Sequence, residues 1–158
     1  MTNPTSITVP DGVPFIDMVR EFDAPRAEVY RAYTEPALVT QWLGPHGYAM
    51  TITEYDVRSG GSWAFSHLDP DGNSWGFHGT FHSVDPNESI VQTFEFEGMP
   101  GHVSLESVRF EDLDGRTRVV AHAAYQSVEA RDAMAAGGME KGVREGYERL
   151  DALLAVTT

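Results

Sequence analysis

The stretch GMEKGVREGYERLDALLA, residues 138–155, is typical of one long amphipathic helix and decides how the rest of the chain is arranged. Its apolar residues recur at spacings of three and four, which place them on one face of a helix with 3.6 residues per turn. That face comprises Met139, Val143, Tyr147, Leu150 and Leu154. We therefore expect a terminal helix that buries one side against the remainder of the protein.

A row of glycines, Gly138, Gly142 and Gly146, runs beside this apolar face. Each interior glycine costs a helix roughly 0.5–1 kcal/mol relative to alanine, so the row indicates that something approaches the helix backbone closely. Two interpretations remain open at this point. The helix could pack tightly on a sheet, or it could cover a ligand cavity.

Upstream of the helix, short alternating segments are separated by turns. Residues 15–22 are the first expected strand, and two short helices are expected within residues 23–45. Six further strands are expected between residues 48 and 125, with no helix between them, and a short helix follows over residues 127–136. This order predicts an α+β fold in which a curved antiparallel sheet wraps around the long C-terminal helix.

The N-terminal stretch lacks a clear period. Residues 1–13 contain Pro4 and Pro10, so we expect a flexible arm with a short extended piece at residues 7–9. The length of 158 residues suits one domain, which we place at residues 14–156. Because an unpaired sheet edge can accept another strand, the arm could also mediate a homodimer.

Composition excludes several classes of partner. The 24 acidic and 11 basic residues give a formal net charge of −13, which repels nucleic acid and anionic membranes. No apolar run approaches the ~20 residues that span a membrane, so membrane insertion is not expected. The chain has no cysteine, and its first residues do not resemble a secretory signal, so we expect a cytoplasmic protein without disulfides.

No established catalytic or metal-binding motif is present. Of the six histidines, His78 and His82 share a strand face, but four residues along a strand span roughly 13 Å, too far for one metal ion. The HExxH, GxSxG and P-loop patterns are also missing. We therefore expect no metal and no cofactor, and we assign no catalytic residue.

Aromatic residues are plentiful on the expected strands, at positions where a subset could line a binding cavity. The alternation favours Trp63, Phe65 and His67, and also Trp75 and Phe77, as inward-facing residues. His67 would then be a polar group in an apolar pocket, able to orient a ligand or shuttle a proton, or else a wet residue at the strand end. The full set of candidate lining residues is Trp42, Trp63, Phe65, His67, Trp75, Phe77, Phe94, Met139, Val143 and Tyr147.

The segments DAPRAEVYRAYTEPALVTQWLGP, DVRSGGSWAF, DPDGNSWGFHGTF and SVEARDAMAAGGMEKGVREGYERLDALL together resemble the family of activator of Hsp90 ATPase homologues. That family lies in the START-like superfamily, also called SRPBCC, with the birch-pollen allergen and aromatic polyketide cyclases. The resemblance covers residues 15–155. It implies a helix-grip fold with a hydrophobic cavity between the sheet and the long helix, and it implies no universal catalytic residue.

Three functions follow from these observations. The first is a binding protein for a small hydrophobic molecule, such as a lipid or an aromatic, polyketide-like metabolite. The second is an enzyme of the polyketide cyclase or dehydratase type, which would need an ionisable group in the cavity, with His67, Glu106, Arg109 and Tyr147 as the residues to check. The third, a co-chaperone that binds a chaperone partner, rests on the family name alone, and the acidic surface does not support it.

Overall fold

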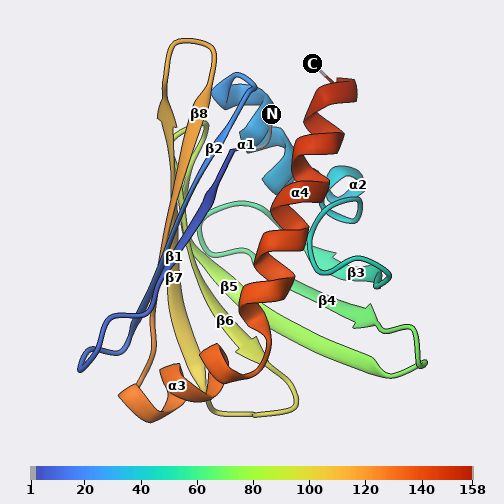
Figure 1. The fold of residues 1–158 in the computed structure, drawn as a ribbon. Helices are drawn as coiled ribbons and strands as arrows, with labels where there is room; N and C mark the ends of the chain where they lie inside the picture. The colour runs from blue at the N-terminus through green and yellow to red at the C-terminus, as the bar shows by residue number, and fades with distance from the viewer. Residues whose placement is uncertain (1–2, 158) are drawn as a thin grey trace.

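The computed structural model describes residues 3–157 and contains one antiparallel sheet and four helices in this range. Figure 1 shows the long C-terminal helix crossing one face of the sheet. In chain order the elements are β1 Thr5–Thr8, β2 Phe15–Phe22, α1 Arg26–Thr34, α2 Pro36–Val39, β3 Ala49–Tyr55, β4 Ser62–Leu68, β5 Ser74–Asp85, β6 Ser89–Phe96, β7 Val103–Asp112, β8 Thr117–Ala124, α3 Val128–Ala136 and α4 Met139–Thr157.

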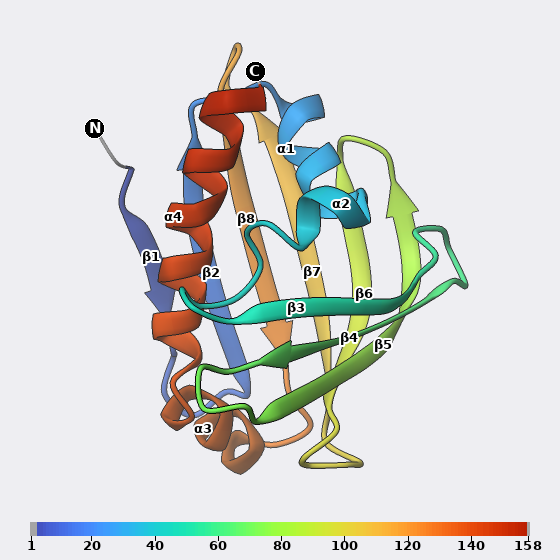
Figure 2. The same ribbon diagram turned by 90° about the vertical axis from the view of Figure 1, so that its right-hand side faces the viewer.

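The sheet has the strand order β1-β2-β8-β7-β6-β5-β4-β3, and each neighbouring pair is antiparallel. It curves around α4, with α1 and α2 at one end of the helix and α3 at the other (Figures 1 and 2). The structure therefore confirms the α+β fold expected from the sequence, with a curved sheet and a terminal helix. Figure 2 shows β3 and β4 crossing in front of β6 and β7, because the curvature of the sheet brings its β3–β4 edge over the concave face.

The N-terminal residues differ locally from the loose arm expected at this place. Residues 5–8 form β1, which pairs with β2 from Thr5 opposite Arg20 to Thr8 opposite Asp17. Thr5 is tied further to the domain, because its hydroxyl accepts a hydrogen bond from Arg20 Nε at 3.2 Å and its carbonyl accepts one from Arg144 at 2.9 Å. The expected homodimer stays a prediction.

The C-terminal part of α4 seals one half of the space between helix and sheet, which we call the packed half. Tyr147, Leu150 and Leu154 are buried there. They join Phe22 from β2, Phe110 from β7, Val119 from β8 and Val29 from α1 in one hydrophobic cluster. Edge-on ring contacts, such as Phe22–Tyr147 at 5.5 Å and Tyr33–Phe110 at 5.1 Å, indicate close packing.

Tight packing explains Gly146 of the glycine row, although its partner is a loop rather than the sheet, whereas Gly138 precedes α4 with a φ of +84° and nothing within 4 Å of an added methyl group. A methyl group added at Gly146 would lie 3.3 Å from the Trp42 carbonyl oxygen and 3.5 Å from the Gly44 nitrogen. At Gly142 it would lie 3.8 Å from the Pro45 ring. Arg149 also donates to the Gly44 carbonyl at 3.1 Å. The loop of residues 42–45 is therefore clamped against the middle of α4.

Candidate functional site

Aromatic side chains from three adjacent strands form a continuous surface on the inner face of the sheet. We call this surface the aromatic wall, and it comprises Trp63, Phe65 and His67 of β4, Phe77 of β5, and Phe94 and Phe96 of β6. Ring centroids lie 5.2 Å apart for Trp63–Phe65, 5.4 Å for Phe65–Phe77 and 5.2 Å for Phe77–Phe96. The low exposure of Trp63 (2%), Phe65 (9%) and His67 (7%) confirms that this face of β4 points inward.

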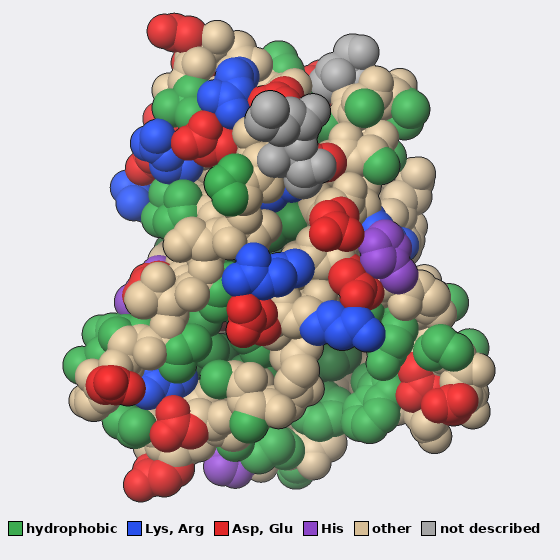
Figure 3. All heavy atoms as spheres, viewed as in Figure 1, with side chains coloured by type: hydrophobic (Ala, Val, Ile, Leu, Met, Phe, Trp, Pro, Cys, Tyr) green, Lys and Arg blue, Asp and Glu red, His purple; other side chains and the backbone are tan. Residues whose placement is uncertain are grey.

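The wall is only partly covered, although it lies on the concave side of the sheet. Phe77, Phe94 and Phe96 are half-buried, as are Met139 and Val143 on the first turns of α4. Figure 3 shows hydrophobic side chains in a hollow beside the N-terminal half of α4. We call this region, between the aromatic wall and residues 139–143, the recess. It forms the open half of the space that α4 seals at its other end.

Glu106 adds a carboxyl group to the floor of the recess. On β7 it lies opposite Gln92 of β6 and Ala123 of β8, and residues directly opposite in antiparallel strands share one face. Its side chain is half-buried and has no hydrogen bond or ion pair with any other residue in the described range 3–157. Burial raises the pKa of this carboxyl to about 7.

Other polar groups surround this carboxyl. Tyr125 follows Ala123 on the same face of the chain, and burial raises its pKa, with a further contribution from the charge of Glu106. Tyr147 on α4 has its pKa raised to about 12, chiefly by burial. Ser104, two residues before Glu106, carries a buried hydroxyl without a hydrogen-bond partner among residues 3–157. The floor of the recess is thus polar, whereas its wall is aromatic.

The nearby cationic side chains are already occupied. Arg20, 1% exposed on β2, forms an ion pair with Asp151 of α4 and also donates to the Glu21 carbonyl. Arg131 of α3 pairs with Asp132 at 2.9 Å and donates to the carbonyls of Pro10 and Phe15. Both guanidinium groups are thus neutralised by other partners, and neither pairs with Glu106.

His67 lies inside the aromatic wall rather than in water at the strand end. Its ring is 5.2 Å from Phe65 and 5.7 Å from Phe77, and a methyl group added at Gly44 would lie 2.6 Å from its Cε1. Burial lowers the pKa of the imidazole, and the charge of Arg149 lowers it further. The Nδ1 atom is buried without a hydrogen-bond partner within the described chain. A neutral imidazole thus lies in apolar surroundings, as one of the two sequence interpretations proposed.

Two residues named from the sequence differ from the others in exposure. Trp75 shares the inner face with His67, as the alternation predicts, and its ring centroid lies 5.9 Å from that of Phe96. It is not buried, however, because it is 41% exposed at the β4–β5 hairpin, where its Nε1 donates to Asp69 at 3.0 Å. Arg109 is largely exposed and pairs with Glu111, so it cannot serve as a cavity group.

Trp42 and Tyr147 belong to the packed half. The Trp42 indole donates to the Ala32 carbonyl at 2.8 Å and stacks on Tyr147 with a centroid distance of 6.5 Å. Five of the other candidate lining residues belong to the hydrophobic cluster or pack against it, namely Trp63, Phe65, Phe77, Phe94 and Val143. His67 contacts Phe65 and Phe77, and Met139 lies one turn before Val143 on α4.

Sequence reasoning missed Gln92, Ser104 and Tyr125 as members of this floor. The signal that could have found them is on β7, where Ser104 and Glu106 alternate in phase with Val108 and Phe110. An acidic residue on the apolar face of a strand is unusual, and its opposite residues on β6 and β8 follow from the hairpin turns.

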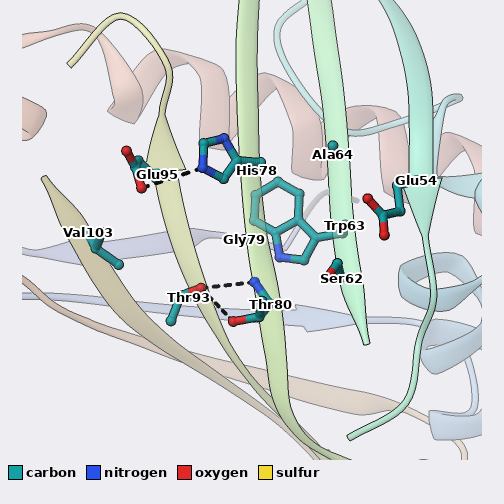
Figure 4. A pocket seen from close by; sticks show the side chains of 10 residues that line it. All are labelled: Glu54, Ser62, Trp63, Ala64, His78, Gly79, Thr80, Thr93, Glu95 and Val103. Atoms are coloured by element: carbon teal, nitrogen blue, oxygen red, sulfur yellow. Dashed lines mark hydrogen bonds and ion pairs between the residues drawn. The ribbon is translucent and has the colours of Figure 1, made fainter. Parts of the chain in front are cut away.

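A second groove, of about 420 Å³, lies on the opposite, outer face of β4–β6 (Figure 4). Its lining is mostly polar, and several groups bond to one another, such as Thr80 N with Thr93 Oγ1 at 2.9 Å and His78 with Glu95 at 3.5 Å. The β5–β6 pairing is interrupted here, between His78–Glu95 and Phe81–Gln92. The lining residues are Glu54, Ser62, Trp63, Ala64, His78, Gly79, Thr80, Thr93, Glu95 and Val103.

Within residues 3–157, no group of three or more His, Cys, Asp or Glu side chains is placed to hold a metal ion. No helix in the same range is both long and apolar enough to cross a membrane.

Comparisons with known proteins agree with this architecture. The family model described as Activator of Hsp90 ATPase homolog 1-like protein matches residues 23–155. A crystal structure from Rhodobacter sphaeroides is 26% identical, with a TM-score of 0.88 over 97% of this chain and 99% of that one. Protein Ms6760 from Mycobacterium smegmatis is 25% identical, with a TM-score of 0.88 over 98% and 99%.

A relative described as an uncharacterized protein of Schizosaccharomyces pombe is 31% identical over 97 residues. The match covers 61% of this chain but only 25% of that protein.

Proposed function

The chain belongs to the family of Activator of Hsp90 ATPase homolog 1-like proteins, and we propose that it binds a small hydrophobic molecule in the recess between the sheet and α4. The observation that carries this proposal is the partial exposure of Phe77, Phe94 and Phe96 on the concave face of the sheet. Along the C-terminal half of α4 the facing residues Phe22, Phe110 and Val119 are buried, so the partial exposure of the rings beside its N-terminal half leaves surface for a guest.

The energetics favour such a guest. Each 100 Å² of apolar surface that it covers contributes about 2.5 kcal/mol, and the rings of the wall present flat faces for an aromatic or extended molecule. Because the wall is assembled from adjacent strands, it is held in place without the guest. Binding therefore requires little ordering of the protein, which is the largest avoidable cost of association.

The separation between His67 and Glu106 favours binding over catalysis by this pair. His67 on β4 and Glu106 on β7 are three strand steps apart in the sheet, on the order of 14 Å before any offset along the strands. A cyclase or dehydratase would need two such groups to converge on one substrate atom. Here His67 lies in the aromatic wall and Glu106 lies on the floor of the recess, so the two groups face different parts of the inner face.

The proposal is tested by native mass spectrometry of the gently purified protein and by thermal shifts with a panel of fatty acids, flavonoids and polyketides. We expect a bound mass that is lost on denaturation, and a stabilisation of about 2.7 kcal/mol when the extracted compound is added at one hundred times its Kd. The Val143→Phe variant, which enlarges a side chain at the recess, should lose this shift. Ala152→Phe, on the exposed face of α4, is the matched control and should keep it.

An apo mass together with no shift from any compound of the panel, and no binding of naphthylethylamine or naphthylethanol, would refute the proposal. Equal shifts in the Val143→Phe variant and the wild type would place binding outside the recess, and the outer groove of Figure 4 would then be the next surface to test.

A further inference from the structure

We propose that the recess selects ligands that carry one protonated amine on an aromatic or apolar body, and that Glu106 is the group that pairs with this amine. The inference rests on the proposed function, because it specifies the chemical class of the guest of the same recess. It follows from the contrast between an aromatic wall and a floor whose acidic side chain, Glu106, has no ion-pair partner among residues 3–157.

The first step concerns charge. Glu106 lies on the inner face, opposite Gln92 and Ala123, without an ion-pair partner among residues 3–157. The two guanidinium groups on neighbouring elements, Arg20 and Arg131, are taken up by Asp151 and Asp132. A carboxylate taken out of water without a partner is unfavourable, so the site favours either a proton or a cation brought by a ligand.

The second step concerns the surroundings of the cation. Phe77, Phe94 and Phe96 are half-buried, and Phe77 contacts both of the others, with centroids 5.4 Å apart for Phe77–Phe94 and 5.2 Å for Phe77–Phe96. Phe94 is the ring beside Glu106, because it lies opposite Ser104, two residues before Glu106 on β7. The faces of aromatic rings attract ammonium groups, and this attraction grows when water is excluded. The Gln92 side chain opposite Glu106 offers an amide oxygen as a further acceptor for an ammonium hydrogen.

The third step concerns what the site rejects. A fatty acid or another carboxylate would bring a second negative charge to Glu106, and like charges at short distance are strongly unfavourable. A neutral alcohol would bring no charge to Glu106 and would forgo the ion pair. The order of affinity for a common apolar body is therefore amine, then alcohol, then carboxylate.

The experiment compares three probes with the same bicyclic body: naphthylethylamine, naphthylethanol and naphthylacetate. Their affinities for the full chain are measured by calorimetry at pH 6 and pH 8. We expect naphthylethylamine to bind at least tenfold more tightly than naphthylacetate at pH 8. Its affinity should rise about tenfold from pH 6 to pH 8, because Glu106 loses its proton near pH 7 while an alkylamine stays protonated to about pH 10.

The groups that face Glu106 from other elements do not produce this profile. Tyr125 after β8 and Tyr147 on α4 have raised pKa values and remain neutral at both pH values. Arg20 and Arg131 are held in ion pairs with Asp151 and Asp132. Gln92 on β6 does not titrate. The change between pH 6 and pH 8 therefore reports Glu106.

Two variants make the test specific. Glu106→Gln should remove both the preference for the amine and its pH dependence, while the affinity for naphthylethanol stays within about twofold. Glu54→Gln makes the same change of charge on the outer face of the sheet and should bind all three probes as the wild type does.

Retention of the amine preference in Glu106→Gln, or its loss in Glu54→Gln, would overturn the inference. If naphthylethanol binds but naphthylethylamine binds no better, the recess is a ligand site and only the amine selectivity is wrong. If none of the probes binds and the broader panel also fails, the proposed function itself is wrong.

Discussion

The two halves of α4 lie over the same curved sheet, yet they face interiors of opposite kinds. Along the C-terminal half, Leu150 and its neighbours are sealed against β2, β7, β8 and α1, and the charged Arg20 is paired with Asp151. Along the N-terminal half, Met139 and Val143 are half-buried, the aromatic wall is partly exposed, and Glu106 has no partner within the described residues. The difference supports a division in which one half provides the stability of the fold and the other provides the ligand site that we propose.

The sharpest test of this comparison is a truncation in each half. Leu150→Ala should lower the free energy of unfolding by about 3–4 kcal/mol, because the fully buried side chain leaves a cavity. Val143→Ala should cost about 1 kcal/mol or less, because water already reaches that part of the helix. Denaturant unfolding of both variants measures the two values. Equal losses would mean that the N-terminal half is packed as tightly as the other.

A second test uses the unpaired carboxyl of the open half. Its pKa of about 7 in the folded protein lies above the ordinary value of 4.5, so the folded state holds the extra proton between these values. Stability therefore falls as the pH rises through this window and levels off above it.

Glu106→Gln removes this loss, so the variant should gain about 2 kcal/mol on the wild type between pH 5 and pH 8, a figure reduced for the partial exposure of the side chain. Thermal unfolding at both pH values measures the gain. A constant difference between the two proteins would show that Glu106 is paired or well hydrated.

The smallest expected change in stability comes from replacing the two glycines of α4, Gly142 and Gly146, with alanine. Gly142→Ala should stabilise the protein by about 0.5–1 kcal/mol, since alanine is the better helix former and the added methyl group lies 3.8 Å from Pro45. Gly146→Ala should gain nothing, because its methyl group would lie 3.3 Å from the Trp42 carbonyl oxygen. Chemical unfolding of the pair measures the difference. If both variants were equally stabilised, the loop of residues 42–45 would not be clamped at Gly146.

Most of the fold could be predicted from the sequence, because apolar residues recur every two positions in its strands and every 3.6 positions in its helices. These spacings can be read without knowing the tertiary contacts. The strand at Phe15–Phe22 and the terminal helix follow from such patterns. The strand at Thr5–Thr8 was harder to predict from the sequence. It is held by pairing with β2 and by a hydrogen bond from Arg144, and the positions of both depend on the tertiary structure.

The candidate site could be predicted only in part. Alternation placed Trp63, Phe65 and His67 on one face, and their burial confirms that this face is the inner one. The exposure of Trp75 could not be foreseen, because it depends on how far α4 extends over the end of the sheet. Glu106 lacks an ion-pair partner because the two nearby arginines bind other carboxylates. Arg20 pairs with Asp151, more than one hundred residues away in the chain, and Arg131 pairs with its neighbour Asp132.

The clamp at Gly146 has a mechanical consequence. α4 is held at its middle, where Arg149 donates to the Gly44 carbonyl and the Gly146 backbone packs against Trp42. Its C-terminal part is held by the burial of Leu150 and Leu153. The first turn of α4 lies ahead of this clamp and of the hydrogen bond from Arg144 to the Thr5 carbonyl, and it is joined to α3 through Gly137 and Gly138. We therefore expect any widening of the recess on binding to occur at this first turn, while the strand pairing of the sheet stays unchanged.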